Sequence, residues 1–109
     1  MQIAIFSFLS PDEYRREAEK GNASAQFYMG GVHECGYAGE PDSEKAVEWY
    51  RKAAEQGHPG AMFNLGTCYL EGTGVKKDIA EAAKWFKRAA SLGHERSAKI
   101  LEKLQKEAM

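Results

Sequence analysis

The sequence has little of three things that would narrow its function at once: net charge, long apolar runs and cysteine. Its 15 basic and 16 acidic residues leave a formal net charge of −1, so no overall field attracts nucleic acid or an anionic membrane. No apolar run approaches the roughly 20 residues that a transmembrane helix needs. Two cysteines do not form the dense disulfide framework of a small secreted domain. We therefore expect a cytoplasmic protein without nucleic-acid or membrane partners, and a periplasmic or secreted location stays open.

What the sequence does contain is an internal repeat. Gly21, Gly57 and Gly93 are spaced by 36 residues each time, and both tryptophans fall in the same register, within "KAVEWYRKAAEQGHPGA" and "EAAKWFKRAASLGHERS". Further matched pairs are Ala25 with Ala61, Gly30 with Gly66, Asp42 with Asp78, Ala46 with Ala82, Trp49 with Trp85, and Tyr50 with Phe86. A chain of 109 residues is one domain by length, and a period of this size indicates a stacked repeat architecture.

Each repeat unit predicts two helices. Pro59 suits the first turn of a helix and Gly72 a left-handed end. Asp78 is expected to cap the next helix, with Glu81 completing a capping box, and Ser10 begins an equivalent signal near the N-terminus. The predicted helices span residues 11–20, 23–35, 43–56, 59–71, 79–92 and 95–108.

Small and aromatic residues at matched positions predict how the helices pack. Glycine inside a helix costs about 1 kcal/mol relative to alanine, so Gly30 and Gly66 predict a close helix approach in both units. Trp49 and Trp85 are interpreted as anchors within or between repeats, and a solvent-facing binding role is the alternative. Glu102 stands 36 residues after Gly66, where a third helix glycine would fall. A bulky charged residue there predicts that no further helix packs on the last one, which therefore caps the array.

These residues resemble the Sel-one-like repeat family, a relative of the tetratricopeptide repeat. The second unit contains every element of the family pattern: Ala61, Leu65 with Gly66, Tyr69, the loop "GTGVKKD", Ala82, Trp85 with Phe86, and Ala89 with Ala90. The first unit departs from it, because His33 replaces the aromatic residue and "GYAGEPD" replaces the Gly-x-Gly-Val loop. That loop is then either looser or filled by Tyr37. The resemblance implies an all-α fold, a right-handed α/α superhelix or solenoid.

The expected organisation is an apolar N-terminal segment, residues 1–10, followed by a repeat domain, residues 11–109. The domain holds two full units, at about 22–57 and 58–93, flanked by half repeats, the last being a capping helix at 94–109. The apolar segment either folds back over the first helices as an N-terminal cap or forms a homodimer through residues 1–9. No basic residue precedes it, so we do not expect a cleaved signal peptide.

The sequence offers little chemistry. His58 and His94 occupy matched positions after a glycine, and we interpret them as polar residues at helix starts, because sites one repeat apart cannot share one zinc ion. His33 and Cys35 are two residues apart on a helix, so their side chains diverge. Cys35 and Cys68 are expected to lie too far apart for a disulfide. We expect no metal, no cofactor and no enzymatic activity.

By resemblance to tetratricopeptide arrays, the first helix of each pair lines a concave binding surface. The partner-binding candidates on it are Phe27, Glu34, Phe63, Thr67, Leu70, Arg96, Lys99 and Lys103, with Gly31 and Lys106 also facing inward. An apolar middle beside a basic end suits a peptide with an apolar anchor and an acidic group. The expected function is a non-catalytic adaptor, regulator or inhibitor that binds another protein or peptide. The alternative is a self-assembling structural module that dimerises through the N-terminal segment.

Overall fold

The computed structural model of the chain describes residues 9–37 and 39–107. Most of these residues lie in six helices: α2 (Pro11–Glu19), α3 (Ala23–Cys35), α4 (Ser43–Glu55), α5 (Pro59–Glu71), α6 (Ile79–Ser91) and α7 (Glu95–Glu107). The predicted helices are confirmed, and three predicted ends run one residue too far, at Lys20, Gln56 and Leu92, which are the C-caps. The predicted end at residue 108 lies outside the described residues, as does the apolar N-terminal segment apart from Leu9 and Ser10.

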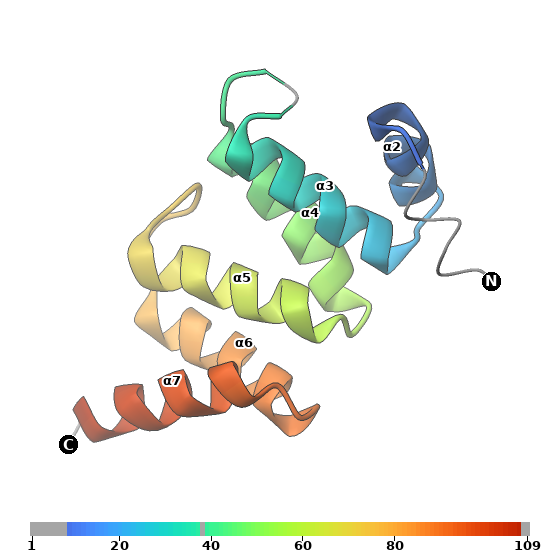
Figure 1. Cartoon of the computed structure of the whole chain (residues 1–109). Coiled ribbons are helices and arrows are strands. Elements are labelled where there is room, and N and C mark those ends of the chain that lie inside the picture. The colour runs from blue at the N-terminus through green and yellow to red at the C-terminus, as the bar shows by residue number, and fades with distance from the viewer. Residues whose placement is uncertain (1–8, 38, 108–109) are drawn as a thin grey trace.

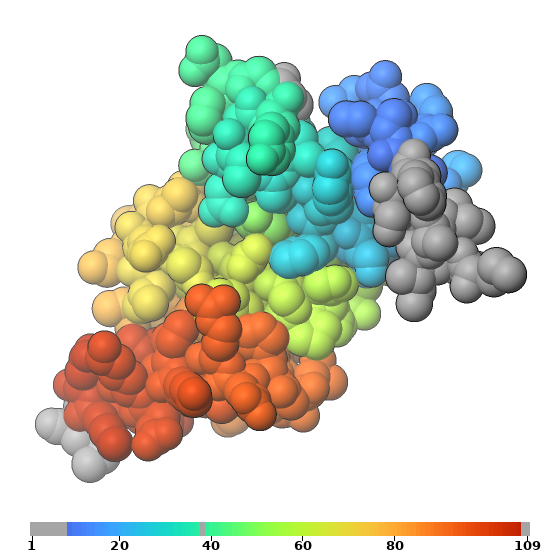
Figure 2. All heavy atoms as spheres, in the orientation of Figure 1, coloured from blue at the N-terminus to red at the C-terminus, as the bar shows by residue number. Residues whose placement is uncertain are grey.

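The helices form two layers. In Figure 1, α3, α5 and α7 form the nearer layer, with α4 behind α3 and α6 behind α5; Figure 2 shows the same face in space-filling form. The extensive contacts all join helices that follow one another in the chain, as in a solenoid where each unit touches only its neighbours. The predicted all-α superhelix of helix-pair repeats is therefore confirmed.

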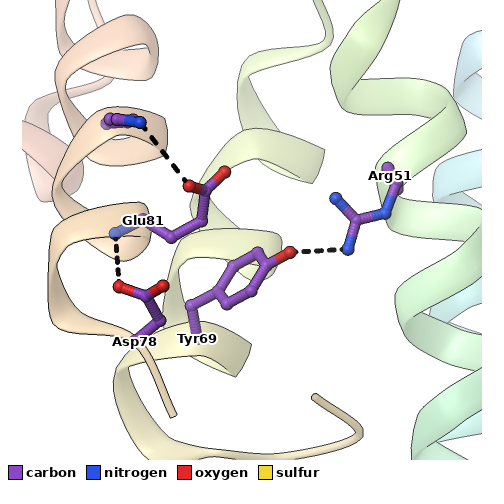
Figure 3. A network of polar contacts seen from close by, with 5 residues as sticks. Arg51, Tyr69, Asp78 and Glu81 are labelled. Carbon is purple, nitrogen blue, oxygen red and sulfur yellow. Dashed lines mark hydrogen bonds and ion pairs between the residues drawn. The ribbon is translucent and has the colours of Figure 1, made fainter. Parts of the chain in front are cut away.

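Side-chain caps fix the helix starts. Ser10 accepts a hydrogen bond from the Glu13 backbone N–H at 3.2 Å while the Glu13 carboxylate accepts one from the Ser10 N–H at 2.7 Å, which completes a capping box. Asp78 caps α6 by accepting from the Glu81 N–H at 3.0 Å (Figure 3). The predicted return bond from Glu81 is wrong, because the Asp78 N–H donates to the Tyr69 carbonyl at 2.9 Å and the Glu81 carboxylate faces Lys84 at 3.8 Å.

Within each unit an aromatic ring lies directly on a helix glycine. The Tyr50 ring of α4 covers Gly30 of α3, and the Phe86 ring of α6 covers Gly66 of α5. A Cβ atom at Gly66 would lie 2.9 Å from the nearest Phe86 ring carbon, and at Gly30 the Tyr50 ring lies closer still. Tyr50 and Phe86 are among the most deeply buried side chains described. The predicted close approach is confirmed, and its partner is an aromatic ring from the second helix of the same unit.

Between units the tryptophans act as anchors. Trp85 of α6 is buried in one cluster with Ala46, Val47 and Tyr50 of α4. Trp49 of α4 is half-buried against a second cluster formed by Ala18, Ala25 and Met29. A polar contact reinforces the junction, because the Arg51 guanidinium of α4 donates to the Tyr69 hydroxyl of α5 at 2.7 Å (Figure 3). The interpretation of both tryptophans as packing anchors is confirmed.

The two inter-helix loops differ as the sequences do. In the second unit, Val75 is half-buried against the hydrophobic cluster that contains Trp85. Gly74, at a φ of 74°, lies against the backbone of Ser43 and the side chain of Val47. Only glycine fits this left-handed, closely packed position. In the first unit Tyr37 is 84% exposed. The alternative in which Tyr37 fills its loop as Val75 does is therefore wrong.

The contact between Tyr50 and Gly30 predicts opposite effects for two adjacent substitutions. Gly30→Ala should lower the free energy of unfolding by about 1–3 kcal/mol, because the new methyl group overpacks against the buried Tyr50 ring. Gly31→Ala should raise it by about 0.5–1 kcal/mol, because a Cβ atom there meets nothing within 4 Å. Urea unfolding followed by circular dichroism measures both. Equal shifts for the two variants would show that the ring does not constrain the glycine.

Candidate protein-interaction surface

The face formed by α3, α5 and α7 is a grid, because the 36-residue repeat places matched residues on three helices. Three rows run across it: Phe27, Phe63 and Lys99; Gly31, Thr67 and Lys103; Glu34, Leu70 and Lys106. Its helix α3 therefore carries aromatic, small and acidic residues, α5 is mostly apolar, and α7 is basic. We call this surface the first-helix face (Figure 2).

On α5, Phe63 is held in place by its neighbours. Its ring centroid lies 5.0 Å from that of His94 and 5.8 Å from that of Phe86. The Arg96 guanidinium carbon of α7 lies over the ring at 4.8 Å from its centroid. Thr67 donates its hydroxyl proton to the Phe63 carbonyl at 3.0 Å. Phe63 and Arg96 therefore come together as a joint between α5 and α7, and the half-buried Phe63 ring packs between repeats.

On α7, the predicted basic residues remain available. Arg96, Lys99 and Lys103 are exposed, and among the described residues no carboxylate lies within ion-pair distance of any of them. Lys106 differs, because its ammonium group lies 3.4 Å from the Glu102 carboxylate. The first three cations can therefore pair with negative groups of a partner without first breaking an internal ion pair.

On α3, the structure brings Phe27, Gly31 and Glu34 together around a cavity of about 390 Å³, which we call the Gly31 pocket. Tyr50 contributes to its wall, and its hydroxyl donates to Glu34 Oε1 at 2.7 Å. Burial, followed by this hydrogen bond, raises the pKa of Tyr50 well above its usual value, so the hydroxyl remains a donor at neutral pH. The remaining lining residues are Tyr28, Val32, Cys35, Tyr37 and Asn64.

Sequence reasoning found Phe27 but missed the other three aromatic residues of this pocket. Tyr28 and Tyr37 belong to no matched aromatic pair, and Tyr50 looked purely structural. A usable signal was the row of Gly31 and Thr67, where the first unit lacks the side chain that the second unit has. The other predicted residue on α5, Leu70, is half-buried and lies outside the Gly31 pocket.

A second hollow, of about 430 Å³, lies between α6 and α7. Its apolar lining residues include Ile79, Ala83, Leu101 and Leu104, and Lys84 and Lys87 also line it. Leu101 and Leu104 match Leu65 and Cys68, which are buried one unit earlier. This groove was not predicted from the sequence, and nothing in the structure shows what covers it.

The two matched histidines are helix caps. His58 Nδ1 accepts from the Ala61 N–H at 3.1 Å, and His94 Nδ1 accepts from the Ser97 N–H at 3.2 Å. The His58 ring also stacks on Phe27, with centroids 4.6 Å apart. Our interpretation of both as polar residues at helix starts is confirmed. The part of the chain that the structure describes holds no group of three or more histidine, cysteine or carboxylate side chains placed to bind a metal ion.

The cysteines are separate. Cys35 is an exposed free thiol and Cys68 a buried one, so the expectation that they form no disulfide is confirmed. Burial, with smaller contributions from the nearby Glu34 and Glu71 carboxylates, raises the pKa of Cys68 to about 11. This thiol is therefore protonated at neutral pH and is a poor nucleophile.

None of the helices between residues 9 and 107 combines the length and the apolar character needed to cross a membrane. The sequence model of the Sel1 repeat matches residues 23–58 and 59–94. Among the curated proteins, none matches this chain.

Solved structures share the fold. A Sel1 repeat protein from Oxalobacter formigenes is 35% identical, with a TM-score of 0.82, over 84% of this chain and 69% of that one. Cysteine-rich protein B of Helicobacter pylori is 27% identical, with a TM-score of 0.80, over 84% and 68%. A protective antigen of uropathogenic Escherichia coli strains that displays an SLR fold is 44% identical, with a TM-score of 0.77, over 79% of this chain but only 18% of its own length.

The His58 cap predicts a pH dependence of stability that asparagine removes. Burial lowers the pKa of His58 below 6.5, so the unfolded chain takes up this proton first as the pH falls. Stability from the cap is then complete above about pH 6.5 and is lost as the pH falls below it. The His58→Asn variant should keep the cap, as Asn22 does at the matched position. Its Tm should therefore fall less than that of wild type when the pH is lowered from about 7.5 to about 5.5.

Differential scanning calorimetry at the two pH values gives the comparison. His33, whose pKa burial and Lys45 also lower, is present in both proteins, so its effect cancels in the difference. A His58→Asn variant that loses as much Tm as wild type would show that the cap does not titrate with folding.

Proposed function

The chain belongs to the Sel1 repeat family, and from this premise we propose that it is a non-catalytic protein-interaction module. It binds a segment of another protein along the first-helix face. The observation that supports the proposal is the change of chemistry across this face, from Glu34 on α3 through Leu70 on α5 to Lys99 and Lys103 on α7. The chain as a whole is nearly neutral, so this gradient is a local property of one surface.

Such a face suits an extended segment that crosses the three helices. Negative side chains or a terminal carboxylate of the partner would lie against Arg96, Lys99 and Lys103, which are exposed and form no ion pair within the described residues. Complementary charges of this kind speed association and fix the orientation of the bound segment. The half-buried Thr67 and Leu70 give the middle of the segment an apolar contact.

Three of the groups that could carry out chemistry have structural roles. His58 and His94 use their Nδ1 atoms as helix caps, and Cys68 is buried as a protonated thiol. This supports an adaptor, regulator or inhibitor that acts by occupying a partner. The free thiols are compatible with the cytoplasm that we propose for it. The alternative is self-assembly through residues 1–9. Of these residues the structure describes only Leu9, so the described residues do not support that alternative.

Charge reversal on α7 tests the proposal. Lys99→Glu combined with Lys103→Glu should weaken capture of the partner by about tenfold, because the two new carboxylates on α7 repel the acidic groups of the partner. The measurement uses the immobilised protein and a lysate of the organism that encodes it, with quantitative mass spectrometry of the proteins retained. Raising the salt concentration should weaken capture by wild type more than capture by the variant.

The matched control is Lys45→Glu combined with Lys87→Glu, which makes the same charge change on the exposed surfaces of α4 and α6. This control should retain the captured protein. If both double variants lose it equally, binding depends on overall charge, and the first-helix face is not the site. Phe63→Ala is unsuitable as a test, since removing its ring would loosen the joint between α5 and α7.

A further inference from the structure

We propose that the Gly31 pocket binds an arginine side chain of the partner segment. The inference rests on the proposed function and names the residue that this part of the first-helix face recognises. Its starting point is the missing side chain at Gly31, where a Cβ atom would meet nothing within 4 Å. The cavity of about 390 Å³ falls in the usual size range of ligand pockets, roughly 300–1,000 Å³.

The lining of the pocket suits a flat cation on an alkyl stem. Four aromatic residues contribute to it: Phe27, Tyr28, Tyr37 and Tyr50. Aromatic faces attract cations, guanidinium groups most often, and also cover the methylene groups of a long side chain. An aliphatic side chain would use the apolar wall equally well, so the charge of the site decides between the two occupants.

Glu34 is the single charged residue in that lining. One carboxylate oxygen, Oε1, accepts the Tyr50 hydroxyl proton at 2.7 Å, which leaves Oε2 for a further donor. Among the described residues no cation lies within ion-pair distance of this carboxylate. A guanidinium group supplies what is missing: it stacks on rings and donates several hydrogen bonds from one plane, whereas an ammonium group is a strongly hydrated point charge.

The second described unit differs at two positions of this pocket. In the second unit Thr67 stands at the position of Gly31 and Leu70 at the position of Glu34, so that unit offers neither the space nor the carboxylate. A bound segment would therefore place one arginine at α3 and its acidic groups toward Lys99 and Lys103 on α7. This order of charges sets the direction in which the segment crosses the helices.

Three blocked pentapeptides of the form Gly-Ser-Xaa-Ser-Gly, with arginine, lysine or leucine as the central residue, test the assignment. Each is titrated into the uniformly ¹⁵N-labelled protein, and backbone amide shifts are followed by NMR. We expect the arginine peptide to give saturable shifts centred on Gly31, Glu34 and Cys35. The lysine peptide should bind more weakly, and the leucine peptide should give no saturable change there.

Two variants and one control make the result specific. Gly31→Thr introduces the side chain of the second unit and should abolish the saturable shifts. Glu34→Gln keeps the shape of the pocket and should weaken the arginine peptide at least about fivefold. Glu71→Gln removes an exposed carboxylate at the end of α5, outside the pocket, and should leave binding unchanged.

Each other outcome overturns the inference. Equal saturable binding of the leucine peptide would make the pocket an apolar subsite, and undiminished binding to Glu34→Gln would remove the role of the carboxylate. The absence of saturable shifts with the arginine peptide would also refute it. None of these results bears on the proposed function, which is tested separately by partner capture with the Lys99 and Lys103 double variant and its matched control.

Discussion

The contact of an aromatic ring with a helix glycine is the constraint on which this structure depends. In each unit the second helix places a large buried ring, Tyr50 or Phe86, directly on a glycine of the first helix. This lets the two helices approach closely, since any Cβ atom would hold them apart. The glycine weakens its own helix, so the packing that it allows must offset that cost in both units.

The same rings connect the scaffold to the binding surface. Tyr50 covers Gly30 with its ring edge and reaches Glu34 with its hydroxyl, so one residue closes the helix pair and orients the carboxylate in the Gly31 pocket. Phe86 covers Gly66 but has no hydroxyl, and the matched partner there is Leu70. The tyrosine hydroxyl and the Glu34 carboxylate together give the first unit a polar pocket wall that the matched residues of the second unit cannot form.

Local signals in the sequence explain why the fold could be predicted. Asp42, Asp78 and Ser10 cap their helices as expected, because a cap depends on residues within one turn. Left-handed glycines end α3 and α5 at the predicted residues. Glu81 could not be placed in this way, since the carbonyl of Tyr69, nine residues earlier, competes for the Asp78 N–H. The 36-residue spacing also predicted that the basic residues of α7 lie on the first-helix face. The enclosure of Phe63 by His94 and Arg96 was not, because it depends on how two successive units stack.

Departures from the repeat carry more functional information than the repeat itself. Positions that match in both units, such as the tryptophans and the ring-covered glycines, do the same packing work twice and cannot tell one partner from another. On the first-helix face the rows change from Phe27 to Lys99, from Gly31 to Lys103 and from Glu34 to Lys106 across the three helices. None of these changes is needed to stack helices, since the face is partly exposed. A uniform scaffold with a varied face separates stability from specificity, so the chemistry of the face can differ while the ring-on-glycine contact stays the same.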